Sequence, residues 1–256
     1  MADDKQKPII FLVHGAWHRP LHYRPLIHAL QAKGFTVLAP PLASSGYDDS
    51  VDGKTYHDDV KRVHDVLLPF LDEGRIAIGI GHSYGGVPLT VATQGHTVAE
   101  RAAKGLKGGV ASAIYISATP VIAKDISMYE SVGNKYTTDW LHEVSEKRLP
   151  LIPDIASDAF YFDVEKSIRD EAMAHVCHQS RGPFEVPVVC TPKDLDIPKI
   201  YVVCLNDKIF LKDIQAYVAD NWGAKPLEIE SGHSPWLIDS HREWLVNLVE
   251  EEAAKA

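Results

Sequence analysis

The chain has 256 residues, of which 45% are apolar and 24% charged, a size and composition typical of one globular α/β domain. Its 26 Lys and Arg and 35 Asp and Glu residues give a formal charge of −9, with no basic stripe of the kind that binds nucleic acid. No apolar run approaches the roughly 20 residues that cross a bilayer. These features exclude a membrane-spanning protein and predict no nucleic-acid partner.

The first residues, Met1–Pro8, lack the apolar segment of a signal peptide, which predicts a cytoplasmic protein. The cysteines are odd in number and have no CxxC spacing, so they predict neither a disulfide framework nor a zinc site. They are Cys177, Cys190 and Cys204.

Short apolar runs alternate along the chain with segments of helical spacing. The runs are Ile9–Val13, Phe35–Ala39, Ile76–Ile80, Ala113–Ser117 and Ile200–Leu205. Because they are continuous and rich in β-branched residues, they predict strands buried on both faces of a parallel sheet. The helical segments include His22–Lys33, Val60–Leu71 and Arg242–Ala253. The alternation predicts an α/β fold, with a mostly parallel, doubly wound sheet and helices on both faces.

The stretch from about 121 to 197 interrupts this alternation with prolines and aromatic residues. Roughly 75 residues are too many for an ordinary connection between two core strands. We therefore expect one domain with a core of residues 8–120 and 198–256 and an inserted helical cap over the active site. The alternative is a subdomain that packs on the edge of the sheet.

The residues Gly81-His82-Ser83-Tyr84-Gly85 form a G-x-S-x-G motif between the predicted strand 76–80 and a predicted helix over Val87–Thr93. In this context the serine lies on a tight strand-to-helix turn that exposes its hydroxyl, and the glycines make room for the turn. The motif predicts Ser83 as a nucleophile; the alternative is a serine that caps the helix.

A serine nucleophile needs a base and an acid to orient it, and in folds with this elbow the histidine follows the acid in the chain. His233 lies in a sharp loop between Leu227–Ile229 and the last helix, whereas His241 falls within the helical pattern. Asp207 directly follows a core strand, which favours it over Asp194, Asp196 and Asp213. We therefore predict a Ser83–His233–Asp207 triad; Asp207 could alternatively cap the next helix.

The loop after the first strand, Val13-His14-Gly15-Ala16-Trp17, lies where the second oxyanion-hole donor is expected. The backbone N–H groups of Ala16 and Tyr84 are the predicted donors. Trp17, Trp140 and Phe160 are candidate substrate-binding residues, although large aromatic side chains more often belong to the core.

Two histidine clusters resemble metal sites in their spacing. His14, His18 and His22 are four residues apart, but Pro20 argues against a regular helix and no carboxylate completes the set. The cluster of His175, Cys177 and His178 lacks a fourth ligand. No nucleotide-binding glycine motif occurs, so neither a metal nor a cofactor is predicted.

These motifs resemble those of the plant methylesterase and hydroxynitrile lyase branch of the α/β-hydrolases. The likeness lies in 13–18, 41–46, the elbow, 201–210 and 232–233, and covers roughly residues 9–118 and 199–250. The cap is more similar to that of small fungal and bacterial esterase-like proteins. The resemblance implies the same triad and a cofactor-free mechanism. Lyases of this branch have a threonine and a lysine at positions that match Gly15 and Ser234 here, so the resemblance favours an esterase.

We thus predict a serine hydrolase that cleaves small, fairly apolar carboxylic esters, lactones or thioesters through an acyl-enzyme. One alternative is a hydroxynitrile-lyase-like or other enzyme that cleaves or cyclises carbon–carbon bonds at the same site. Another is a ligand binder without catalysis. The expected partner is a small ester-like molecule, and a homodimer is left open.

Overall fold

The computed structural model describes residues 6–131, 133–134, 136, 139–142 and 145–256. Its main sheet has six parallel strands, which confirms the predicted doubly wound α/β architecture. In the order in which they pair, they are β2 (Val37–Leu38), β1 (Ile9–Val13), β4 (Ile76–His82), β5 (Gly109–Ile116), β7 (Lys199–Cys204) and β8 (Lys225–Ile229). The central strands are buried on both faces, as their continuous apolar runs require.

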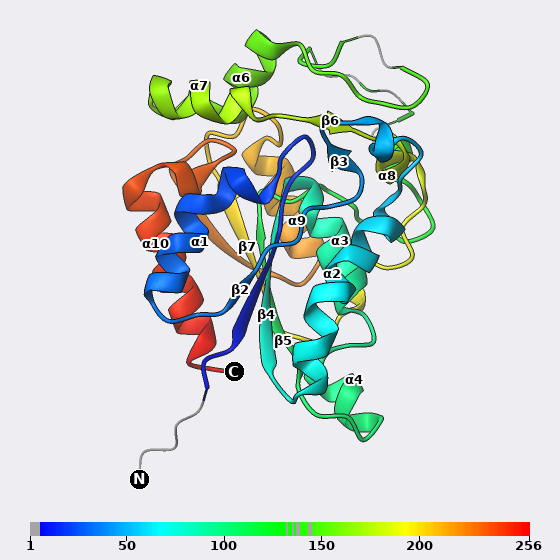
Figure 1. The fold of residues 1–256 in the computed structure, drawn as a ribbon, viewed down its shortest axis with the longest axis vertical. Coiled ribbons are helices and arrows are strands. Elements are labelled where there is room, and N and C mark those ends of the chain that lie inside the picture. Colours follow the sequence, from blue (N-terminus) through cyan, green and yellow to red (C-terminus); the bar gives the residue numbers. More distant parts are fainter. Residues whose placement is uncertain (1–5, 132, 135, 137–138, 143–144) are drawn as a thin grey trace.

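Helices cover both faces of this sheet (Figure 1). Helices α1 (Arg24–Ala32) and α10 (Asp239–Ala253) pack together on one side, and α2 (Tyr56–Asp72) and α3 (Gly86–Thr93) on the other. Helix α9 (Lys212–Asn221) contacts β7 and β8, and α4 (Val98–Ala103) contacts β5. The core therefore lies in two layers, one on each face of the sheet.

The strand predicted over Phe35–Ala39 is wrong in its extent, because only Val37 and Leu38 pair with β1. This strand lies at the edge of the sheet and is followed by Pro40 and Pro41, which have no N–H group for a ladder. The helix predicted from His22 begins instead at Arg24, after a 3₁₀ turn over Pro20–Tyr23.

In its described residues, the insertion between β5 and β7 carries four short α-helices and a strand, which leave the main sheet uninterrupted. They are α5 (Met128–Ser131), α6 (Pro153–Tyr161), α7 (Lys166–Ala174), β6 (His178–Gln179) and α8 (Gly182–Glu185). Helices α6 and α7 lie over the carboxyl ends of the core strands (Figure 1). Strand β6 pairs antiparallel with β3 (Ser45–Gly46), which ties the insertion to the core. We propose that this insertion is the cap.

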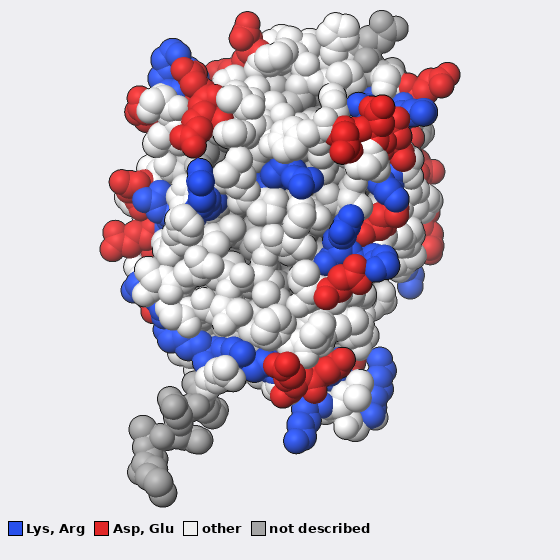
Figure 2. All heavy atoms as spheres, viewed as in Figure 1, with Lys and Arg blue, Asp and Glu red and all other residues white. Residues whose placement is uncertain are grey.

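Acidic and basic side chains are interspersed on the face shown in Figure 2. Several form ion pairs, such as Lys33 with Glu250 at 2.7 Å and Arg148 with Asp52 at 2.6 Å. Among the described helices, none combines the length and the apolar character needed to span a membrane.

Candidate active site

Ser83 lies directly after β4, at the start of a 3₁₀ turn (Ser83–Gly85) that leads into α3. Its φ of 52° is in the left-handed region, which is strained for a residue with a side chain. A Cβ atom at Gly85 would overlap the carbonyl oxygen of Val13, so this position requires glycine. The turn therefore has the geometry expected of a nucleophile elbow.

His233 and Asp207 form a buried pair beside this turn. The imidazole Nδ1 donates to Asp207 Oδ2 at 2.7 Å, and both residues are at most 4% exposed. The other carboxylate oxygen, Oδ1, accepts the N–H groups of Ile209 at 2.6 Å and Phe210 at 3.3 Å. Asp207 thus caps the turn at Ile209 and Phe210 and also binds the imidazole. It does not cap α9, because that helix begins only at Lys212.

The other candidates for the catalytic acid and base lie elsewhere in the chain. Asp194 forms a capping box with Thr191, and Asp213 is in the exposed first turn of α9. His241 lies on α10, as its helical pattern predicted.

Ala16, a predicted oxyanion donor, lines the same cavity as Ser83 and Tyr84. The N–H groups of Gly15, Trp17 and His18 each donate to a protein acceptor, but no acceptor within the described chain is recorded for the Ala16 N–H. The Tyr84 amide lies in the first turn of its helix, where N–H groups have no intrahelical acceptor. Gly15 packs closely against the elbow, because a Cβ there would lie 3.0 Å from His82 Nδ1 and 3.2 Å from Ser83 Cβ.

Two neutral histidines hold this loop. His14 Nε2 accepts the Leu42 N–H at 3.0 Å, so its Nδ1 carries the proton and donates to the Gly15 carbonyl at 2.9 Å. His18 donates through Nδ1 to the Ala16 carbonyl at 2.6 Å and accepts at Nε2 from the Tyr161 hydroxyl of α6 at 2.5 Å. Burial lowers the pKa of His14 to about 3 and that of His18 well below its ordinary value.

The same bonds explain the four-residue spacing of these histidines. His22 accepts the Arg19 N–H at Nδ1 (2.9 Å) and donates through Nε2 to the Ala172 carbonyl (3.1 Å), so all three rings have protein partners at both nitrogens. In the part of the chain that the structure describes, no cluster of His, Cys, Asp and Glu could hold a metal ion.

A relay of hydrogen bonds joins the three loops of the site. The Gly15 N–H donates to the Tyr23 hydroxyl at 2.8 Å, which donates to His82 Nδ1 at 2.6 Å. His82 Nε2 in turn donates to the His233 carbonyl at 2.9 Å. Burial lowers the pKa of His82 well below its ordinary value, which keeps the ring neutral, as the relay requires. The relay therefore connects the oxyanion loop, the elbow and the histidine loop.

The insertion also supports the site. Asp163 accepts the Gly232 N–H at 2.5 Å, next to His233. Gln179 of β6 accepts the Trp17 N–H at 3.1 Å and the Ser45 hydroxyl at 2.6 Å. Neither residue was predicted, because each contact joins positions far apart in the sequence and no local pattern marks it.

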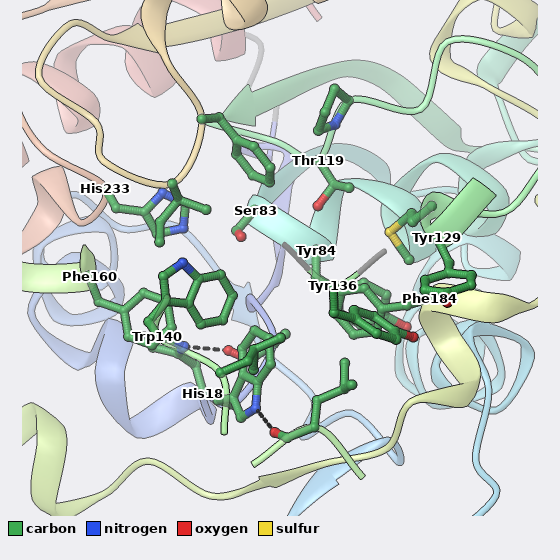
Figure 3. A pocket seen from close by; sticks show the side chains of 18 of the residues that line it. His18, Ser83, Tyr84, Thr119, Tyr129, Tyr136, Trp140, Phe160, Phe184 and His233 are labelled. Atoms are coloured by element: carbon green, nitrogen blue, oxygen red, sulfur yellow. Dashed lines mark hydrogen bonds between the residues drawn. The ribbon is translucent and has the colours of Figure 1, made fainter. Parts of the chain in front are cut away.

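Ser83 and His233 open onto a cavity of about 150 Å³ (Figure 3). The predicted residues Trp17, Trp140 and Phe160 all line it, with the Trp17 ring centroid 5.2 Å from that of Trp140 and 6.1 Å from that of Phe160. Further lining residues that sequence analysis missed include Thr119, Met128, Tyr136, Phe184, Ile209 and Phe210. No Asp, Glu, Lys or Arg is among the described residues around the cavity.

A parallel doubly wound sheet with a strained serine elbow and a buried His–Asp pair defines a hydrolase-type α/β protein. The sequence profile of the alpha/beta hydrolase family matches residues 10–248, and the chain belongs to this family. The resemblance and the fold class predicted from the sequence are thereby confirmed.

Individual relatives are distant but match over nearly the whole chain. The alpha/beta hydrolase nvfD of Aspergillus novofumigatus is 26% identical over 260 residues, which cover 98% of each chain. Methylesterase 17 of Arabidopsis thaliana is 23% identical, over 93% of this chain and 89% of its own. The crystal structure of a pyrethroid hydrolase from Sphingobium faniae has a TM-score of 0.77 and 23% identity, and covers 96% of this chain and 97% of its own. Membership of this family and the names of these relatives agree with the predicted class of enzyme, a hydrolase.

Proposed function

We propose that this protein hydrolyses small, neutral carboxylic esters at Ser83, with His233 as base and Asp207 as the acid that orients it. The observation that carries the proposal is the buried His233–Asp207 pair beside a strained serine that lines the same apolar cavity. The methylesterase relative, by its name an ester hydrolase, supports the reaction type.

In the proposed mechanism, Nε2 of His233 removes the proton of the Ser83 hydroxyl as the oxygen attacks the ester carbonyl. The N–H groups of Ala16 and Tyr84 stabilise the negative charge on the carbonyl oxygen. His233 then protonates the leaving alcohol. A water molecule, deprotonated by the same imidazole, releases the acid from the acyl-enzyme and restores Ser83.

The cavity limits the substrate by size and by charge. An apolar cavity on the order of 150 Å³ holds a benzene-sized ring. Its walls are aromatic rings that favour offset or edge contacts with another ring. Since no charged side chain is among its described lining, an ionised substrate group would lose its hydration without gaining a partner. We therefore propose esters with one neutral aromatic or compact apolar group.

The alternatives are less well supported. A lyase that releases cyanide needs a cation at the site, but Ser234 follows His233 here and the nearby His18 is neutral. A binder without catalysis would not require the buried His–Asp pair or the strained elbow, each of which costs free energy in a buried site.

The test compares hydrolysis of phenyl acetate, phenyl decanoate and 4-acetoxybenzoate by the native protein. We expect phenyl acetate to have the highest kcat/KM, because the long chain exceeds the cavity and the carboxylate has no partner there. Ser83→Ala should lose at least about 10³-fold in kcat, whereas Ser240→Ala, at an exposed position on α10, should match the native protein. Equal turnover by the Ser83 variant would refute the proposal.

A further inference from the structure

A fourth polar side chain contacts the His–Asp pair. Ser117 is the residue directly after β5 and is fully buried. Its hydroxyl is hydrogen-bonded to Asp207 Oδ2, the same oxygen that binds His233, and its Oγ lies 3.4 Å from His233 Nδ1. Sequence analysis placed Ser117 only at the end of a strand, because nothing local marks its partner 90 residues away.

The direction of this hydrogen bond follows from its neighbours. His233 Nδ1 donates its own proton to Asp207, so it offers no lone pair to the Ser117 hydroxyl. The hydroxyl must therefore donate to the carboxylate. With Ile209 and Phe210 on Oδ1, Asp207 accepts four hydrogen bonds and its charge is distributed over all of them.

The backbone at Ser117 is held in an unusual conformation. Its φ of 39° is in the left-handed region, where a serine is strained by about 1–3 kcal/mol. Two backbone hydrogen bonds enforce this conformation. The Ser117 N–H donates to the Val202 carbonyl at 3.1 Å, and the Thr119 N–H donates to the Ser83 carbonyl at 3.1 Å. A glycine would adopt the same backbone without strain, but it would leave the carboxylate without the hydroxyl.

We infer that Ser117 is a positioning residue of the triad, whose hydroxyl holds the Asp207 carboxylate and weakens its hold on the imidazole proton. This inference rests on the proposed function. Without the hydroxyl, Asp207 would carry more charge toward His233 and stabilise the imidazolium. The neutral base that catalysis needs would then form only at higher pH.

Other titratable groups around the pair do not produce such a shift. Burial lowers the pKa values of His82 and His18 and raises those of Tyr201 and Cys204, so all four stay neutral near pH 7. Among the charged side chains near the pair, Asp163 binds the Gly232 N–H at 2.5 Å and Lys208 pairs with Asp158 at 2.7 Å. None of these contacts involves the Ser117 hydroxyl.

The experiment measures the pH profile of kcat/KM for p-nitrophenyl acetate, and of the rate of fluorophosphonate labelling, in Ser117→Ala and Ser117→Gly. Both variants lose the hydroxyl, but only the glycine relieves the backbone strain. We expect the acid limb to move to higher pH by roughly half to one unit in both, equivalent to about 0.7–1.4 kcal/mol. Ser112→Ala is the matched control, because Ser112 is a buried serine of β5 whose hydroxyl has no recorded partner.

An acid limb that stays unchanged in both variants would overturn the inference, as would a shift seen in only one of them, since that would trace to the backbone. A control that shifts equally would overturn it too. If the native protein neither turned over the ester nor reacted with the fluorophosphonate, the proposed function itself would fail, and the role of Ser117 with it. Thermal unfolding of all variants reports folding separately, with the glycine expected to unfold at a higher temperature than the alanine.

Discussion

Removal of one buried hydroxyl, in Tyr23→Phe, tests the relay that connects the loops of the site. Tyr23 is 1% exposed, and its ring stacks on that of Trp236 with the ring centroids 4.3 Å apart, a contact that phenylalanine keeps. The variant would leave the Gly15 N–H and His82 Nδ1 buried without partners. Each unpaired group costs about 1–3 kcal/mol, so we expect the free energy of unfolding to fall by about 2–6 kcal/mol.

The same change should act on catalysis through the oxyanion loop. Gly15 precedes the Ala16 donor, and loss of one oxyanion donor lowers kcat by about 10²–10³. A displaced donor should lower kcat by at least about tenfold, with KM nearly unchanged, because this bond strengthens in the transition state.

Urea unfolding gives the stability of this variant, and p-nitrophenyl acetate hydrolysis gives kcat and KM. The matched control is Tyr47→Phe, whose hydroxyl is also hydrogen-bonded, to the His175 carbonyl at 2.8 Å, but whose side chain is 58% exposed. We expect the control to stay within about 0.5 kcal/mol of the native stability. If Tyr23→Phe matched this control in both stability and kcat, the relay would have no role in stability or catalysis.

Three further changes have defined outcomes. In the ester assay, Asp207→Asn should lower kcat by about 10⁴-fold, because the imidazole loses its carboxylate partner. The control, Asp163→Asn, keeps an amide oxygen that can accept the Gly232 N–H, so its kcat should stay within about tenfold of the native value. Gly85→Ala should destabilise the fold more than Gly53→Ala in thermal unfolding. At Gly53, with a φ of 71° and open space, an alanine adds only backbone strain of about 1–3 kcal/mol, whereas at Gly85 its Cβ would overlap the Val13 carbonyl oxygen; similar losses would refute the packing argument. Burial lowers the pKa of His14 to about 3, so the unfolded chain binds its proton first, near pH 6.5. The free energy of unfolding should therefore be nearly constant between about pH 7 and pH 8 and fall steadily from about pH 6.5 toward pH 3, and a flat curve between pH 7 and 4 would contradict this.

Local patterns in the sequence predicted the parts of the fold that form locally. The run Ile9–Val13 became β1 without change, and the G-x-S-x-G motif spans the end of β4 and the turn into α3, a strand–turn–helix unit as expected. The edge strand was predicted too long, because the apolar pattern of Phe35–Ala39 does not show that the strand has one neighbour and is followed by prolines.

The contacts that complete the site are not local, and the sequence did not predict them. Tyr23 binds His82 across 59 positions and Ser117 binds Asp207 across 90. A tyrosine in a helical turn or a serine at a strand end is common, so residue type alone does not reveal such a partner. The lining residues Tyr136 and Phe184 are likewise placed by the fold of the insertion, which has no strong periodic pattern.

The central claim is that the buried His–Asp pair activates Ser83. Its most direct test is intact-mass spectrometry after exposure to a fluorophosphonate, with Ser83→Ala and Ser240→Ala beside the native protein. The account predicts one adduct on the native chain and on the Ser240 variant, and none on the Ser83 variant. No adduct on the native chain, or an equal adduct on Ser83→Ala, would contradict it.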